Sequence, residues 1–163
     1  MQTLIYIPFI LQMVVIFLDE ALFHIKRDLP KWERIGHPLD TLTVIACFAF
    51  VYWVPYDRSM IGWYIALAIF STIFVTKDEF VHKEHCPAAE QWLHAILFVN
   101  HSIVLSLLGL IWPHLHGSEI FSFLPSIDRL NILTLSQMVG AGCFCLYQIV
   151  YWNLIRKPLE ANK

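Results

Sequence analysis

Charged side chains are scarce in this chain of 163 residues, at 15% of the total against 58% hydrophobic residues. An average soluble domain carries about 25% charged and about 45–50% apolar residues. A domain of this size leaves much of its folded surface exposed, so a soluble fold could not bury this many apolar residues. The formal net charge of −2 also lacks the basic excess that a nucleic-acid partner favours. The composition therefore predicts a membrane protein, in contact with membrane lipid, with no nucleic-acid partner.

Cysteine motifs and nucleophile motifs are missing as well. The four cysteines form no CxxC pair, and three of them lie inside apolar runs. We interpret them as small apolar residues, which excludes a disulfide framework and a Cys-based zinc site. No Ser-His-Asp or Cys-His arrangement is evident. The first apolar run follows no basic segment and precedes no small-residue cleavage site, so we do not expect a signal peptide.

Long apolar runs are what the sequence does contain. A membrane-spanning helix needs roughly 20 predominantly apolar residues. We predict an all-α, polytopic membrane protein in which residues 1–163 form a single transmembrane domain. Its first four helices are expected to form an antiparallel bundle around a polar site. The five predicted spans cover about 4–24, 38–54, 60–82, 90–112 and 132–155.

The distribution of basic residues predicts the orientation. Connections on the cytoplasmic side of a membrane carry an excess of Lys and Arg. With five spans, the first connection, the third connection and the C-terminal tail lie on one side, and they hold nine of the eleven basic residues. Only Arg58 and Arg129 lie on the other side. We therefore expect the N-terminus outside and the C-terminus inside, in the cell (inner, cytoplasmic) membrane.

Acid–histidine pairs gather at the cytoplasmic ends of the first four predicted spans. Residues three or four apart share one face of a helix, so each pair presents one carboxylate and one imidazole together. His101 lies on the same face as His94, about 10 Å deeper along the helix. The four pairs are Glu20 and His24, His37 and Asp40, Glu79 and His82, and Glu90 and His94.

Neighbouring acids are interpreted as ordinary polar residues. Asp19 and Asp78 lie off the helix faces that the pairs define, so we expect them at the membrane interface. Asp28, Glu33 and Glu84 fall in charged connections and are expected to face solvent.

Imidazoles and carboxylates converging in a membrane are typical of a metal site. Carboxylates balance the charge of a divalent cation, and the cation offsets the cost of burying them. Four acids and four histidines would suit two ions, either iron or zinc. The predicted ligands are Glu20, His24, Asp40, Glu79, His82, Glu90 and His94, with His37 and His101 as additional ligands or proton relays.

One of these pairs resembles a known type of centre. The spacing Glu79-Phe-Val-His82 matches the Glu-x-x-His element of di-iron carboxylate four-helix proteins, whose ligands all face the bundle interior. The resemblance is at the level of this motif and covers the four ligand segments. It implies a di-metal centre inside the bundle. A di-metal oxidoreductase or hydroxylase that uses oxygen on a lipid or quinone is the first functional hypothesis, with a hydrolytic zinc centre as its variant.

Three other interpretations stay open. A divalent metal transporter would use the cluster as a binding station, although only Gln12, Asn100, His101 and Gln137 suggest a polar path further along. A haem protein could use His94 and His101 as axial ligands. A network of salt bridges could satisfy the acids through Lys26, Arg27, Lys77 and Lys83.

Overall fold

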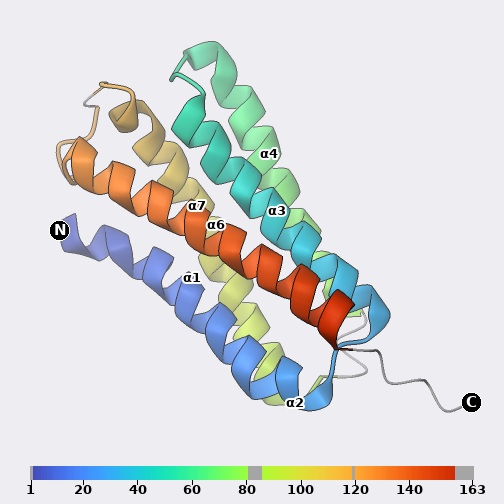
Figure 1. The fold of residues 1–163 in the computed structure, drawn as a ribbon. Coiled ribbons are helices and arrows are strands. Elements are labelled where there is room, and N and C mark those ends of the chain that lie inside the picture. Colours follow the sequence, from blue (N-terminus) through green and yellow to red (C-terminus); the bar gives the residue numbers. More distant parts are fainter. Residues whose placement is uncertain (1, 81–85, 119, 157–163) are drawn as a thin grey trace, which may run out of the picture.

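The computed structural model describes residues 2–80, 86–118 and 120–156 of the chain (Figure 1). Five long helices dominate this described part, and short helical turns extend several of them. The long helices are α1 Tyr6–Asp19, α3 Lys31–Trp53, α4 Ile61–Phe74, α6 Ala88–Leu115 and α7 Ile127–Ile149. The short segments are η1 Gln2–Ile5, η2 Glu20–His24, α2 Ile25–Arg27, η3 Arg58–Met60, η4 Val75–Asp78 and η5 Val150–Ile155.

Five of the continuous helical stretches in the described ranges are long and apolar enough to cross a membrane. This confirms the predicted all-α class and the predicted number of spans, and it indicates a multi-pass membrane protein. The stretches cover Gln2–Arg27, Lys31–Trp53, Arg58–Lys77, Ala88–Leu115 and Ile127–Ile155. The predicted third span reaches 82, and its last two residues lie outside the described part.

The second stretch begins earlier than the sequence predicts. The prediction starts this span at 38 because the preceding segment is polar. In the structure α3 begins at Lys31, directly after Pro30, whose extended backbone (φ −63°, ψ 155°) forms the helix boundary. Glu33 then lies in the first turn, where the positive end of the helix dipole favours a carboxylate. The connection between the first two spans is therefore a tight turn around Asp28 and Leu29, and Glu33 is part of a helix.

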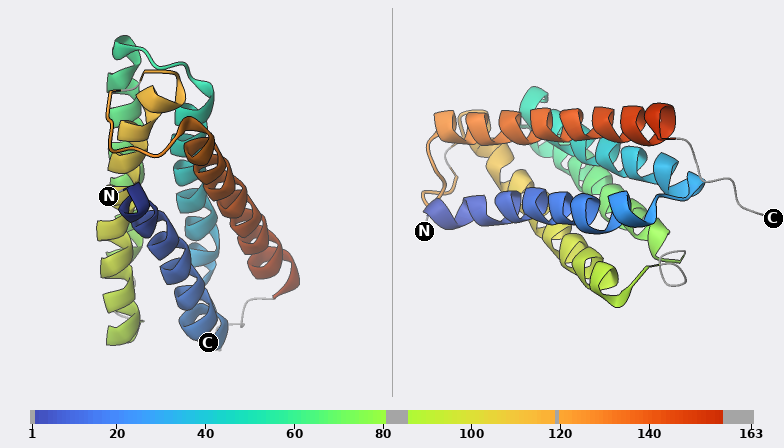
Figure 2. Two further views of the ribbon diagram at one scale, coloured as in Figure 1. Left: turned by 90° about the vertical axis from the view of Figure 1, so that its left-hand side faces the viewer. Right: turned by 60° about the horizontal axis from the view of Figure 1, so that its bottom comes forward.

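The helices run alternately up and down (Figure 1), and they pack as one bundle. Helix α1 packs along α6, while α3 contacts α4, α6 and α7. The fifth helix, α7, lies along α3 on the side of the bundle where α1 also runs (Figure 2). The fifth helical stretch also contributes side chains to the polar site, through Tyr147 and Trp152.

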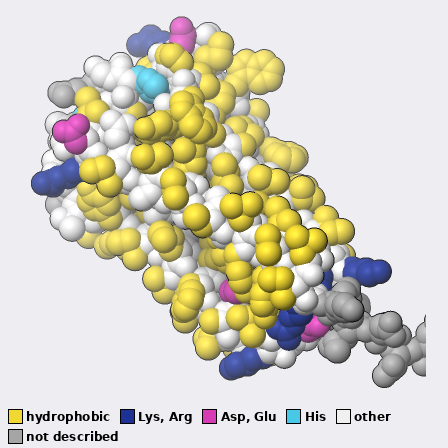
Figure 3. Space-filling view, viewed as in Figure 1, with side chains coloured by type: hydrophobic (Ala, Val, Ile, Leu, Met, Phe, Trp, Pro, Cys, Tyr) yellow, Lys and Arg dark blue, Asp and Glu magenta, His cyan; other side chains and the backbone are white. Residues whose placement is uncertain are grey.

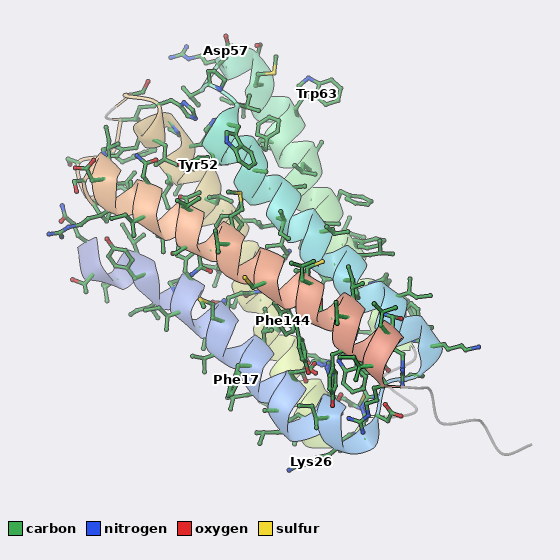
Figure 4. All side chains as sticks on the ribbon, in the orientation of Figure 1. Phe17, Lys26, Tyr52, Asp57, Trp63 and Phe144 are labelled. Atoms are coloured by element: carbon green, nitrogen blue, oxygen red, sulfur yellow. The ribbon has the colours of Figure 1, made fainter. Side chains whose placement is uncertain are left out.

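The bundle interior divides into an apolar part and a charged part. Phe9, Phe48, Leu108 and Trp112 belong to one buried apolar core. The opposite end, which we call the charged end, is where residues 19–37, 90–94 and 147–156 meet. Lys26 lies at the charged end, and Asp57 lies at the other end (Figure 4). On the face seen in Figure 3, apolar side chains predominate between the two ends, as expected for a surface that faces lipid.

Candidate metal centre

A wide helical turn shapes the first half of the site. Segment η2 is a π-helix, in which the backbone N–H of Ile25 donates to the carbonyl of Glu20, five residues earlier. In an α-helix, residues five apart are rotated by roughly 140° from each other. The wider π turn brings them onto one face, and such turns are frequent at functional sites. Asp19 and His24 therefore point the same way, and His24 Nε2 lies 3.1 Å from Asp19 Oδ2.

Helix α6 supplies the second half of the site. His94 Nε2 lies 3.1 Å from Asp19 Oδ1, so Asp19 stands between the two imidazoles. Glu90, one helical turn before His94, places its Oε1 3.6 Å from His24 Nε2. Each of these four side chains offers an oxygen or nitrogen within 4.8 Å of those of the others. The main cluster is therefore Asp19, His24, Glu90 and His94.

The donor atoms of the main cluster fit a metal ion. Ligands that bind one ion at 2.0–2.2 Å stand roughly 3–3.5 Å from each other. The distances of 3.1 Å and 3.6 Å around His24 Nε2 are close to that spacing. All four residues are buried, with Glu90 at 0% exposure. His24 Nε2 is also buried, and no described group makes a hydrogen bond to it. An imidazole nitrogen aimed at two carboxylates in this way is well placed to bind a cation.

A second group of ligand atoms shares His24. Ligand atoms of His24, Glu33 and His37 also lie within 4.8 Å of one another. The rings of His24 and His37 pack edge to face, with their centroids 4.8 Å apart. His37 Nε2 lies 3.9 Å from Glu33 Oε2. The two groups meet at His24, and both lie at the charged end.

Arg27 connects the two groups. Its Nη2 donates to Glu33 Oε2 at 2.7 Å and to Glu90 Oε1 at 2.8 Å, and its Nε also donates to Glu90. Both carboxylates are at 0% exposure, so the guanidinium compensates two buried negative charges. The interpretation that salt bridges satisfy the acids is therefore correct for part of the site. The carboxylates of Asp19 and Glu20 contact histidines in addition.

Glu20 lies beside the main cluster and is held by the fifth helix. Its Oε1 accepts hydrogen bonds from the Tyr147 hydroxyl at 2.7 Å and from Trp152 Nε1 at 2.9 Å. Its Oε2 lies 3.1 Å from His24 Nδ1. Trp152 belongs to η5, a second π-helical segment. The π-helical segments η2 and η5 are therefore joined by the hydrogen bond between Trp152 and Glu20. The other oxygen of the Glu20 carboxylate orients the imidazole of His24.

The remaining predicted ligands lie around the cluster at different distances. Glu79 Oε1 is 3.6 Å from His94 Nδ1, with 39% of the Glu79 side chain exposed. Asp40 forms an ion pair with Lys77, at 2.6 Å. His101 is buried deeper in the bundle, and its Nε2 lies 3.1 Å from the Ser71 hydroxyl. His82 lies outside the described residues.

Three expectations about neighbouring acids are wrong. Asp19 is buried at 5% exposure because the π turn rotates it onto the face of His24. Glu33 is buried because α3 begins before it. Asp28 is also largely buried, and its carboxylate pairs with Arg34 at 2.9 Å. Glu33 had a usable signal, because Glu33-x-x-x-His37 repeats the spacing of Glu20-x-x-x-His24 and Glu90-x-x-x-His94.

A cavity of about 520 Å³ adjoins the cluster. This volume lies within the usual range for ligand pockets, about 300–1,000 Å³. Its walls are mainly apolar, and Asp19, Glu20, His24 and His94 line its charged end. In Figure 3 an acidic side chain is visible between the apolar side chains of α1 and α7. The candidate metal ligands are thus accessible from an apolar chamber inside the bundle.

Fold and site together define a helical, membrane-like protein with a buried His, Asp and Glu cluster that could hold a metal ion. No protein-family model matches the chain, and no curated protein or solved structure matches it. The function is therefore inferred from the residues of the site.

Proposed function

We propose that this protein is a membrane-embedded metalloenzyme that oxidises an apolar substrate. Asp19, His24, Glu90 and His94 would bind one divalent ion, and Glu33 and His37 would bind a second ion beside it. The observation that carries the proposal is the main cluster itself, a set of four buried ligand residues at one end of an apolar cavity.

A metal explains the composition of the site better than salt bridges do. Where an acid only needs a counter-charge, Lys or Arg supplies it directly, as Arg27 does for Glu33 and Glu90. Asp19 contacts two imidazoles, each of which is neutral or charged depending on its protonation. Neutral imidazole with carboxylate is a ligand set for iron and zinc. Binding a divalent cation would neutralise the buried carboxylates and engage His24 Nε2.

The reaction class follows from the ligands and the cavity. A pair of iron ions held by His and carboxylate supports oxygen chemistry, and the apolar walls favour a lipid or a quinone as the substrate. In a hydroxylation, one oxygen atom of O₂ enters a C–H bond of the substrate and the other leaves as water. Such a step consumes two electrons and two protons from an external donor. Tyr147 and Glu20 line the cavity and could pass a proton towards the site.

The two alternative functions receive less support. A transporter needs a polar path, but Gln12 and Asn100 bond to each other at 2.8 Å, and the buried apolar core lies beyond them. Haem needs an open space between two axial imidazoles. Asp19 occupies the space between His24 and His94. The pair that the haem interpretation names, His94 and His101, projects from one face of the same helix, so these two imidazoles do not enclose such a space.

The orientation completes the proposal. With the N-terminus outside, the charged end faces the cytoplasm, where basic residues are favoured. A reductant in the cytoplasm could then supply electrons to the site. A reporter fused after residue 163, with activity on only one side of the membrane, measures the orientation directly. An external C-terminus would overturn this part of the proposal.

The metal content of the purified protein tests the central claim. We expect about two iron or zinc ions per chain in detergent-purified protein, as in di-metal bundles. The double variant Glu90→Gln plus His94→Ala should lose most of that metal. The matched control is His116→Ala, a histidine near the far end of α6 that contacts the carbonyl of Val51. Protein that holds no metal after incubation with ferrous iron or zinc, or equal metal in both variants, would contradict the proposal.

A further inference from the structure

The cavity extends far beyond the metal ligands. Its lining residues on α1 and η2 run from Gln12 to His24, a distance of about 18 Å along a helix. On α6 they run from His94 to Val104, which is about 15 Å. Phe48 and Val104, both 2% exposed, close the deep end. The chamber is therefore elongated along the bundle, with its polar groups concentrated at the charged end.

The cavity has a side wall that is thin between α1 and α7. Met13 and Phe17 line it from α1, and their side chains are 51% and 69% exposed. Gly140 and Phe144 line it from α7. Phe17 and Phe144 mark the two helices that border this side (Figure 4). A Cβ atom built on Gly140 would find Met13 Cε as its nearest neighbour, at 3.9 Å. This side therefore separates the cavity from the apolar outer surface by the exposed side chains of Met13 and Phe17.

The polar groups at the charged end of the cavity suit an uncharged ligand. The hydroxyl of Tyr147 donates to Glu20, and the hydroxyl of Thr41 donates to Gln148 at 2.9 Å. Asp19, Glu20 and Asp40 are the acids that line the cavity, and no Lys or Arg lines it among the described residues. In the protein without metal, an anionic head group would meet the carboxylates of Asp19 and Glu20 in a medium of low dielectric constant, where repulsion is strong. An alcohol would instead be able to donate its hydroxyl hydrogen to the carboxylate of Glu20 or to the hydroxyl oxygen of Tyr147 or Thr41.

We infer that the cavity binds a single-chain lipid with an uncharged polar end, of the long-chain alcohol class, which enters from the bilayer between α1 and α7. The polar end lies beside Glu20 and the metal ligands, and the hydrocarbon chain extends towards Phe48 and Val104. This inference rests on the proposed function, since it names the substrate class of the same site. Binding of the chain uses the apolar walls and does not itself require the metal.

Equilibrium binding of radiolabelled hexadecanol tests the inference. The measurement uses the full chain in lipid nanodiscs, once as purified and once after removal of metal by a chelator. We expect about one alcohol per chain in both preparations. Hexadecanoic acid at pH 8 and a short-chain ubiquinone serve as competitors in the metal-free preparation, and each should bind at least about tenfold more weakly. Displacement of the alcohol by either competitor at an equal concentration would overturn the assigned class.

Two glycines of α7 provide a matched pair of variants. Gly140→Phe fills the thin wall, and we expect at least about tenfold weaker binding of hexadecanol. Gly142→Phe places the same side chain two residues away, at a glycine that does not line the cavity and has nothing within 4 Å of the position that a Cβ atom would take. It should bind the alcohol as the wild type does. If Gly140→Phe lowers the melting temperature, Gly140→Leu introduces a smaller side chain at the same place. Equal binding by the Gly140 and Gly142 variants would contradict entry between α1 and α7.

Metal content measured on the same samples separates the two proposals. If the alcohol binds and no metal is found, the cavity inference stands and the metalloenzyme proposal fails. If metal is present and the alcohol does not bind, the metal centre stands and the substrate class is wrong. Gly140→Phe should retain the wild-type metal content, because Gly140 belongs to neither group of metal ligands.

Discussion

Arg27 and Glu90 are 63 positions apart in the chain, yet the guanidinium of Arg27 reaches both carboxylate oxygens of Glu90. The contact joins the end of the first helical stretch to the start of α6. Together with the bond from Arg27 to Glu33, it connects three helical stretches at the charged end. The same carboxylates belong to the candidate metal site, so the guanidinium and a metal ion would share the task of compensating them.

Removal of this guanidinium should destabilise the fold. Arg27→Met leaves two buried carboxylates without their cation, and the loss of one partner from a buried ion pair costs about 3 kcal/mol. Thermal unfolding in detergent should therefore shift to lower temperature, and added zinc should recover part of the shift. Lys26→Met is the control, since Lys26 is the exposed neighbour. Equal melting temperatures for both variants would show that Arg27 carries no such role.

The turn after the first helical stretch has an unusual backbone. Asp28 has φ 66° and ψ 152°, a region that glycine adopts far more easily than other residues. Its carboxylate compensates by accepting from the backbone N–H of Leu29 at 3.0 Å and by pairing with Arg34. Asp28→Ala loses the carboxylate and keeps the strain, whereas Asp28→Gly loses the carboxylate and relieves it. We expect the Gly variant to be more stable than the Ala variant by about 1 kcal/mol, measured by unfolding in detergent. The opposite order would contradict the strain.

Close packing between α4 and α6 depends on Gly109. A Cβ atom there would lie 2.7 Å from Cε1 of Tyr64, a buried side chain whose hydroxyl donates to the carbonyl of Leu105 at 2.6 Å. Gly109→Ala should force the ring to move and reduce stability by about 2 kcal/mol, the usual scale for overpacking. Gly62→Ala is the control, because nothing lies within 4 Å of its Cβ position. A melting temperature for Gly109→Ala at or above that of the control would rule out the steric conflict.

The pH dependence of one acid follows from its hydrogen bonds. At the far end of the bundle, the hydroxyl and the backbone N–H of Ser59 both donate to Asp57, at 2.7 Å, and they lower the pKa of its carboxyl. Because the folded state favours the ionised form, this contribution to stability is present above the ordinary Asp pKa of about 3.9. It is lost as the pH falls through the lower pKa of the folded state.

Ser59→Ala removes the hydroxyl and should raise the Asp57 pKa towards its ordinary value. The carboxyl carbon signal of Asp57, followed by NMR as a function of pH, measures the change. Ser122→Ala, in the connection between α6 and α7, is the control and should leave the titration of Asp57 as in the wild type. Identical titrations in both variants would show that the Ser59 hydroxyl does not affect the acid.

The membrane spans and three of the four residues of the main cluster were predictable from local patterns. Apolar runs of spanning length mark the helices, and the i, i+4 spacing of Glu20 with His24 and of Glu90 with His94 indicates shared helix faces. Glu33 and His37 have the same spacing. Their polar neighbours, Lys31 and Arg34, made the start of α3 resemble a loop.

The rest of the site depends on features that local patterns do not encode. Asp19 joins the cluster only because the turn after it is π-helical, and helical periodicity assumes an α-helix. Tyr147 and Trp152 reach Glu20 from more than 120 positions away, through the packing of α7. Arg27 points inwards because two carboxylates from other helices meet it there. Such contacts are set by tertiary structure.

The wide turn at 20–24 gives the first membrane helix two different angular registers, one before Asp19 and one after it. Gln12 faces Asn100 in the first register, and His24 faces Glu90 in the second. If the same residues wound as a regular α-helix, one register would rotate by about 100° relative to the other. Either the Gln12 side or the His24 side would then turn towards lipid. The extra residue that the π turn accommodates therefore lets one helix make both sets of contacts, to Asn100 and to Glu90.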